Sequence, residues 1–142
     1  MLSHDRLTIK AGEALQTAAQ EGQRRGNPSL EDIHLLHALL GQEGTVVVPV
    51  LQKVGANVSR LVESVRSALD RLPKQTGGGV MPSLSREASR ILGRAEQEAR
   101  GLGDEYVSVE HLLLALAAEP GSTTRELLTA QGASDAALRD AL

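Results

Sequence analysis

The chain carries an internal duplication. When the 142-residue sequence is aligned with itself at a shift of 77 positions, residues 7–61 and 84–138 share 17 identities without a gap. Two copies are too few for a solenoid, which needs three or more repeats to bury a continuous core. We therefore expect two related units that pack around a pseudo-twofold axis. The identical pairs include Leu7 with Leu84, Gly26 with Gly103, His34 with His111, and Gly55 with Gly132.

Each copy has the apolar spacing of four helices, with capping and helix-ending residues between them. In the first copy, apolar residues recur every three or four positions from Leu7 to about Gln23, and a more apolar segment covers about Glu31 to Gln42. The counterpart of that second segment covers about Val109 to Ala118, and the fourth helix of the first copy extends to about Leu72. Residues that suit a helix N-cap or a left-handed helix end stand at the predicted boundaries. The caps are Thr8, Asn57, Ser85, Ser122 and Ser134, and the helix ends are Gly26 and Gly103.

The third helix is clear only in the second copy, where Ser122 precedes it and Gly132 ends it. The matching stretch of the first copy, residues 46–50, reads Val-Val-Val-Pro-Val and taken alone is typical of an edge strand. Leu51 and Gly55 nevertheless match their counterparts in register, and a helix tolerates a proline such as Pro49 in its first turn. The duplication therefore predicts a helix here as well.

The fold class that follows is all-α, with two pseudo-twofold-related four-helix repeats in one domain over residues 1–142. Repeat one covers 1–72, a flexible connector covers 73–83, and repeat two covers 84–142. The connector contains Gly77–Gly79, which invites comparison with a phosphate-binding loop. Such a loop needs Lys-Ser or Lys-Thr after its last glycine, whereas Val80-Met81-Pro82 follows here.

Composition excludes several kinds of site. The chain has no cysteine, which removes thiol nucleophiles, disulfides and cysteine metal sites. The 15 basic and 18 acidic residues are interspersed, and Tyr106 is the single aromatic residue, so we expect no nucleic-acid partner. No apolar run approaches the roughly 18 residues of a membrane span, and the N-terminus lacks the apolar core of a signal peptide. We expect a cytoplasmic protein that does not bind membranes.

Three short motifs stand in order along the chain: Asp5-Arg6-Leu7-Thr8-x-Lys10, then Glu31-x-x-His34-Leu35 through to Gln42-Glu43-Gly44, then Arg71-Leu72-Pro73 before the glycine-rich connector. Together they resemble the N-terminal domain of the Clp ATPases, over essentially the whole chain. Within that family, the glycine-rich connector after Arg71-Leu72-Pro73 is most similar to ClpB-type disaggregases. The resemblance implies an all-α pseudo-dimer carried as a mobile appendage on a hexameric AAA+ unfoldase. This chain has no Walker motif, so ATP is implied as a cofactor of the full-length protein only.

Three polar residues match positions that the resemblance implicates in substrate handling: Thr8, Asp104 and Glu110. From the residues alone, Thr8 is an N-cap at an anion-favouring helix N-terminus, and the two acids are partners of a helix dipole. Tyr106 lies between the two carboxylates and joins them as a candidate substrate-binding residue. The pair Glu110-His111 also matches the pair with which ClpC-type domains recognise phosphoarginine or adaptors. Repeat one has Ile33 at the equivalent position, so at most one such site is expected.

A domain that recognises unfolded chains needs an exposed apolar groove. The helix that we expect to wall such a groove is the first of repeat two. It carries the candidate residues Ile91 and Leu92, although burial statistics favour ordinary core packing for these two. Arg94 and Glu98 on the same helix occupy positions where some ClpB relatives have leucine. The predicted groove is therefore more polar here.

No catalytic or metal site is expected. His34 and His37 lie one helical turn apart but lack a third and a fourth ligand, and the chain has no Gly-x-Ser-x-Gly elbow. The first hypothesis is a substrate-recognition domain that binds unfolded or aggregated polypeptides for AAA+ modules of the same chain. The second is an adaptor-docking or phosphoarginine-recognition domain of a ClpC/ClpA-type unfoldase, with an adaptor or co-chaperone as partner.

Overall fold

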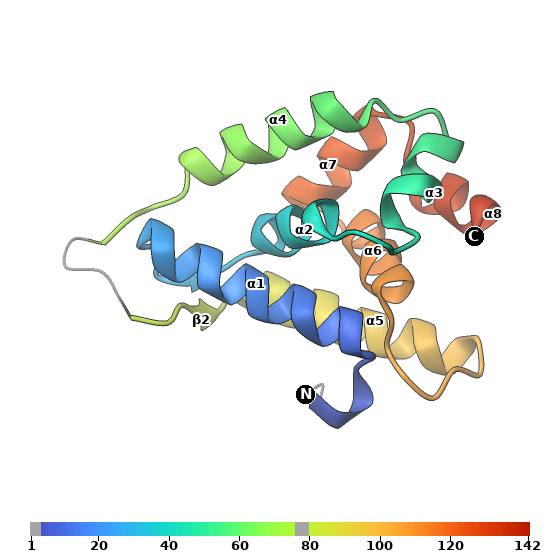
Figure 1. Cartoon of the computed structure of the whole chain (residues 1–142), viewed down its shortest axis with the longest axis horizontal. Coiled ribbons are helices and arrows are strands. Elements are labelled where there is room, and N and C mark those ends of the chain that lie inside the picture. Colours follow the sequence, from blue (N-terminus) through green and yellow to red (C-terminus); the bar gives the residue numbers. More distant parts are fainter. Residues whose placement is uncertain (1–3, 76–79) are drawn as a thin grey trace.

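Eight α-helices and two very short strands make up the chain over residues 4–75 and 80–142, which are the residues that the structure, a computed structural model, describes (Figure 1). The all-α class with two four-helix repeats is confirmed. Gly77–Gly79 of the predicted connector lie outside the described residues. The first half contains α1 (Ile9–Arg25), β1 (Ser29–Leu30), α2 (Asp32–Gly41), α3 (Val47–Lys53) and α4 (Val58–Asp70). The second half contains β2 (Ser83–Leu84), α5 (Arg86–Gly101), α6 (Val109–Ala118), α7 (Thr123–Ala130) and α8 (Asp135–Ala141).

Local capping explains where the helices begin. The hydroxyl of Thr8 accepts a hydrogen bond from the amide of Ala11 at 3.2 Å, and Ser85 caps α5 in the same way. The predicted caps Asn57, Ser122 and Ser134 also accept their first-turn amides. The valine-rich stretch is helical, as the duplication predicted, with Pro49 in the first turn of α3.

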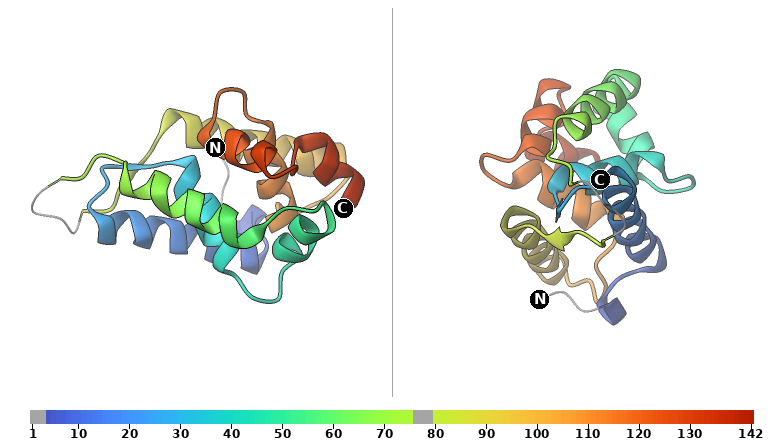
Figure 2. Two further views of the ribbon diagram at one scale, coloured as in Figure 1. Left: turned by 90° about the horizontal axis from the view of Figure 1, so that it is seen from above. Right: turned by 90° about the vertical axis from the view of Figure 1, so that its left-hand side faces the viewer.

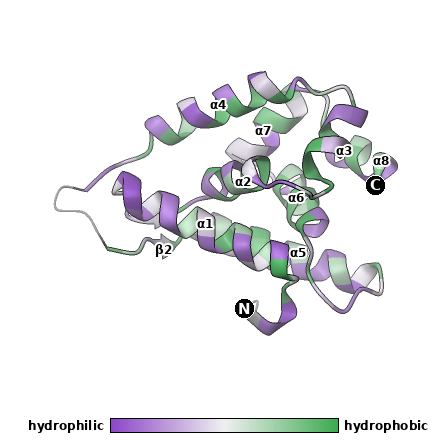
Figure 3. Cartoon of the chain, viewed as in Figure 1, coloured by the Kyte–Doolittle hydropathy of each residue, from purple (hydrophilic) through white to green (hydrophobic). Residues whose placement is uncertain are grey.

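Helices α2 and α6 form the centre of the fold, and Figure 2 shows the other helices around them. Helix α2 contacts α1, α3, α4, α5, α6 and α7, whereas α6 contacts α1, α2, α3, α5, α7 and α8. These two sets exchange when each helix is replaced by its copy in the other repeat. Polar and apolar residues alternate along the surrounding helices (Figure 3), and on α4 the buried residues include the apolar Leu61, Val65 and Leu69. No helix in the described ranges combines the length and apolarity of a membrane span.

The two repeats are also joined by reciprocal main-chain pairing. Strands β1 and β2 pair in parallel, with Leu30 opposite Leu84, and an isolated parallel bridge joins Leu7 to Val107. A shift of 77 residues converts Leu30 into Val107 and Leu7 into Leu84, so each bridge is the image of the other. Each repeat thus pairs the segment before its first helix with the other repeat. The sequence did not predict these bridges because two-residue strands carry no readable periodicity.

A buried carboxylate adds a link on one side of the twofold axis. Asp32, on α2, is 4% exposed, and its Oδ2 accepts from the amide and the hydroxyl of Thr124 on α7, each at 3.0 Å. The hydroxyl also lies 3.0 Å from the carbonyl oxygen of Leu116. The equivalent residues on the other side are Val109 and Val47, which are apolar and buried. This link is therefore not duplicated.

We predict that Thr124→Val lowers the free energy of unfolding by about 1.5–3 kcal/mol, because the carboxylate of Asp32 loses a hydroxyl donor in the core. Urea denaturation followed by circular dichroism measures the change. The control is Thr123→Val, the same substitution at the exposed neighbouring threonine, which should stay within about 0.5 kcal/mol of the parent. Equal losses in the two variants would show that the buried link contributes nothing special.

Candidate functional site

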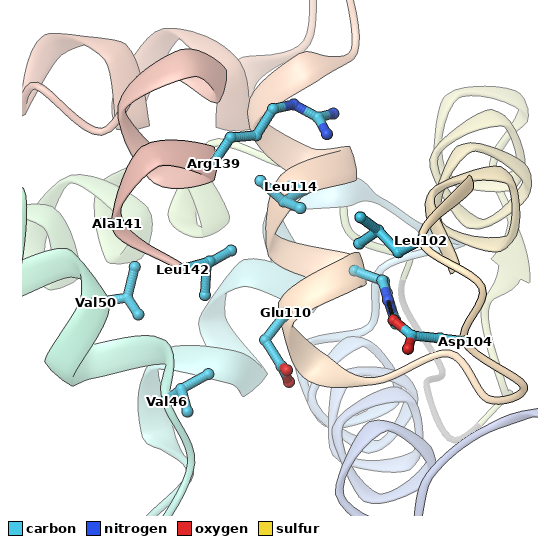
Figure 4. Close-up of a pocket in the computed structure, with 10 residues that line it drawn as sticks. Val46, Val50, Leu102, Asp104, Glu110, Leu114, Arg139, Ala141 and Leu142 are labelled. Atoms are coloured by element: carbon cyan, nitrogen blue, oxygen red, sulfur yellow. Dashed lines mark hydrogen bonds and ion pairs between the residues drawn. The ribbon is translucent and has the colours of Figure 1, made fainter. Parts of the chain in front are cut away.

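Two adjoining depressions lie on the surface beside α6. The larger, which we call the main groove, has a volume of about 600 Å³ and lies between α3, α6, α8 and the loop after α5 (Figure 4). The smaller, the side groove, has a volume of about 380 Å³ and lies where the start of α1 approaches the start of α6. The main groove is lined by Val46, Val50, Leu102, Asp104, Glu110, His111, Leu114, Arg139, Ala141 and Leu142. The side groove is lined by Thr8, Ile9, Lys10, Gly44, Thr45, Val46, Ser108, Val109 and Glu110.

Aliphatic side chains supply most of the main groove. Glu110 and Leu114 lie four residues apart on α6, so both face the groove from the same side of that helix. Val46 at the start of α3 and Leu142 at the end of α8 lie across from Leu102 (Figure 4). Leu102 is 62% exposed, and Val46 and Leu142 are each more than 40% exposed. The groove therefore presents open apolar surface to solvent.

Three of the predicted site residues lie along these two depressions. Thr8 lines the side groove, Asp104 lines the main groove, and Glu110 lines both. No hydrogen bond or ion pair engages the Glu110 carboxylate within the described part of the chain, whereas the hydroxyl of Thr8 caps α1. Glu110 is thus the residue that the two depressions share, with Thr8 in one and Asp104 in the other.

The other three predicted site residues lie elsewhere. Ile91 is completely buried, because it continues the stripe of Ala88, Ala95 and Ala99 with which α5 packs into the core. Leu92 is partly buried against that core. Ile91 and Leu92 therefore do not line either groove, contrary to our expectation. Tyr106 is 48% exposed and also lines neither depression.

His111 connects Asp104 to the start of α6. Its Nδ1 accepts from the amide of Ser108 at 2.9 Å, so Nε2 carries the proton and donates to Oδ2 of Asp104, also at 2.9 Å. The hydroxyl of Ser108 lies 3.0 Å from Nδ1, which gives a Ser-His-Asp arrangement. That hydroxyl also accepts from the amide of His111 in a capping box. Because Nδ1 already accepts a main-chain proton, it is a poor base for the serine, and the three residues form a helix cap.

Repeat one contains the same cap, with Asn27 in place of Asp104 and Glu31 in place of Ser108. The Nδ1 atom of His34 accepts from the amide of Glu31 at 2.9 Å, and its Nε2 donates to Oδ1 of Asn27 at 2.8 Å. The amide group of Asn27 in turn donates to the carbonyl of Pro73 at 2.9 Å. Asn27 is the counterpart of Asp104, and a neutral amide fulfils the structural role there. The negative charge of Asp104 is therefore not needed to orient the histidine.

Sequence reasoning missed most of the apolar lining. Leu102 stands where repeat one has Arg25, and Val46 stands where repeat two has Thr123. These exchanges between polar and apolar residues are a signal in the duplication, because an apolar side chain where the other repeat has a polar one indicates that the two repeats differ in their surroundings there. No such signal exists for Leu142, because its place in the groove depends on how α8 packs.

Arg94 and Glu98, which we expected to make the groove more polar, are both in ion pairs. Arg94 Nε lies 3.4 Å from Oε1 of the buried Glu119, and Glu98 pairs with Arg139 of α8. In the described ranges, no three His, Asp or Glu side chains gather at a metal-binding distance. Both ring nitrogens of His34 are already engaged, as described above.

We predict that the buried His34 makes stability depend on pH. Burial, together with the nearby charge of Arg25, lowers the pKa of His34 below its ordinary value of about 6.5. The unfolded chain therefore takes up a proton on acidification before the folded chain does, so the free energy of unfolding falls as pH drops from about 7 to 5. In His34→Gln this fall should be shallower by up to about 1.4 kcal/mol per pH unit. Urea denaturation at several pH values measures the slopes, and parallel curves would contradict the prediction.

The family model described as the Clp repeat (R) N-terminal domain matches residues 6–131. The chain is 40% identical over 138 residues to chaperone protein ClpB of Propionibacterium freudenreichii and 42% identical over 134 residues to that of Mycobacterium tuberculosis. These alignments cover 96% and 94% of this chain but only 16% of each relative.

A solved structure supports the fold. The Hsp104 N-terminal domain from Candida albicans superposes with a TM-score of 0.84 at 19% identity, and the match covers 95% of this chain and 87% of that one. At this identity the likeness concerns the fold alone. The family model and the ClpB alignments cover most of the sequence, and from them we conclude that the chain belongs to the Clp repeat N-terminal domain family.

Proposed function

We propose that the chain is the substrate-recognition domain of a ClpB-type chaperone, and that the main groove and the side groove bind apolar stretches of unfolded polypeptide. The observation that carries the proposal is the open aliphatic lining of the main groove next to two carboxylates. Native proteins bury most of their large apolar side chains, so exposed apolar surface distinguishes unfolded clients from folded ones. The chain spans 16% of the ClpB relatives, and ATP-driven disaggregation is assigned to modules outside it.

The carboxylates of Asp104 and Glu110 would make the grooves prefer some apolar client segments over others. Asp104 has the neutral Asn27 as its counterpart, and the counterpart of Glu110 is the buried Ile33. The fold of the other repeat is therefore built without either charge. Two acids beside an apolar groove complement segments in which Lys or Arg neighbours an aliphatic residue. We infer that such segments bind best.

Affinity for a single domain should be low. The contact is small and partly polar, which corresponds to dissociation constants of roughly micromolar to millimolar. On a hexameric ring, several copies engage one aggregate, and effective concentration raises the overall avidity without stronger single contacts. Weak single contacts also allow the client to be passed on to the motor.

Recognition of phosphoarginine, alone or on an adaptor, is the second candidate. The side groove places the carboxylate of Glu110, which suits a guanidinium, near the N-terminus of α1, which favours an anion. This combination arises once, where α1 of repeat one meets α6 of repeat two, since the counterpart of Glu110 is Ile33. This candidate predicts binding of a folded phosphoarginine-bearing protein and no preference for unfolded chains.

We predict that the double variant Asp104→Asn with Glu110→Gln binds an unfolded client about three- to tenfold more weakly, because two charge-assisted contacts are lost. Chemical-shift titration against a reduced and alkylated model protein measures affinity, with the native form of the same protein as the reference. Stability should change by less than about 0.5 kcal/mol, since Asn at position 104 can hold His111 as Asn27 holds His34.

The matched control is Glu63→Gln with Glu105→Gln, which removes the same two charges from exposed positions outside both grooves. It should bind like the parent chain. If the two double variants lose affinity equally, net charge alone explains the effect. If neither loses affinity, the carboxylates are not part of a client site and the adaptor hypothesis takes precedence.

A further inference from the structure

The main groove continues toward a third depression across an ion pair. This depression, which we call the α5 groove, has a volume of about 300 Å³ and lies between α5 and α8. Leu102 and Arg139 line both the main groove and the α5 groove, whereas Glu98 lines the α5 groove only. The two depressions therefore meet at Leu102 and Arg139. The polar group at this junction is the side chain of Arg139.

The Arg139 guanidinium is held by three of its nitrogens. Its Nη1 donates to Oε2 of Glu98 at 2.9 Å, Nη2 donates to the other oxygen of the same carboxylate, and Nε donates to Oδ1 of Asp135 at 3.0 Å. Paired parallel bonds of this kind fix the orientation of both groups. Asp135 lies one turn earlier on α8, so the contact with Glu98 is the one that ties α8 to α5.

This pair is charged around neutral pH but is open to solvent. The hydrogen bonds from Arg139 lower the pKa of Glu98, and Glu98 raises the pKa of Arg139. The side chain of Arg139 is 42% exposed and that of Glu98 is 16% exposed, so solvent and ions reach the pair from the arginine side. Added salt therefore screens the attraction between the two groups.

We propose that the Arg139–Glu98 pair is a strap that limits the length of the client groove. With the strap closed, an apolar segment reaches Leu102 from the main groove and stops there. With the strap open, the main groove and the α5 groove join into one longer channel along α5 and α8, with Leu102 in its floor. The claim about client length rests on the proposed function, whereas the strap itself is a property of the free domain.

The test compares Glu98→Gln, Arg139→Gln and the double variant in binding an uncharged, unfolded aliphatic peptide by chemical-shift titration. Each single variant breaks the strap, so both should bind about two- to fivefold more tightly than the parent, and the double variant should add nothing further. Because the peptide carries no charge, a change in the net charge of the domain alone would leave both single variants like the parent. Unchanged or weaker binding in both single variants, or tighter binding in only one of them, would overturn the proposal.

Glu96→Gln is the matched control. It breaks the pair between Glu96 and Arg100, which lies within α5 and lines none of the three grooves, and it should bind like the parent. Urea denaturation of all variants checks that tighter binding does not come from partial unfolding. A rise in affinity for the control equal to that of Glu98→Gln would also overturn the proposal.

A second readout needs no client. Raising the salt concentration should shift the methyl resonances of Leu102 in the parent toward their positions in Glu98→Gln, and it should leave the variant unchanged. If no unfolded probe binds the parent but the methyl shifts behave as stated, the strap stands and the proposed function fails. If probes bind but the methyl groups of Leu102 do not respond to salt or to the substitution, the proposed function stands and the strap is wrong.

Discussion

The fold depends on the contact between α2 and α6. Both helices are apolar on nearly all sides, and neither can exist in water without being surrounded. Leu36 and Leu39 of α2 are fully buried, as are Leu113 and Leu116 of α6. Each central helix is covered by elements of both repeats. One repeat alone would leave its central helix partly open, so the two repeats form a single cooperative core.

Much of this fold could be predicted from the sequence, because the helix boundaries depend on nearby capping residues or recur in both repeats. A helix cap such as Thr8 or Ser122 acts within three residues, so its role is written in the nearby sequence. Helix α3 was predicted against the strand propensity of its valines only because its copy, α7, is unambiguous. The parallel bridges between the repeats, such as Leu7 with Val107, were not predicted, since pairing between segments 54 or 100 residues apart leaves no local pattern.

The candidate site was predictable only in part, for a physical reason. Polar residues such as Asp104 and Glu110 stood out by chemistry and by resemblance to a family. An aliphatic residue on a helix, by contrast, reads the same whether it faces the core or a groove. Ile91 was named as a candidate for the groove, with the core as the other interpretation, and it lies in the core, whereas Leu102 was overlooked and is exposed. Tertiary packing decides whether such a residue lies in the core or in a groove, and the spacing of apolar residues along a helix does not determine that packing.

The main groove has no aromatic side chain among the residues that line it. Aliphatic walls attract by contact area and offer little direction, so they rank one apolar sequence only weakly above another. Differences in affinity between related ligands are expressed mainly as dissociation rates, and walls without aromatic anchors or buried hydrogen bonds favour short residence times. Under the proposed function, a groove of this kind samples many chains and holds none for long. The exchange of clients at its surface would then be limited by the rate of association rather than by the rate of dissociation.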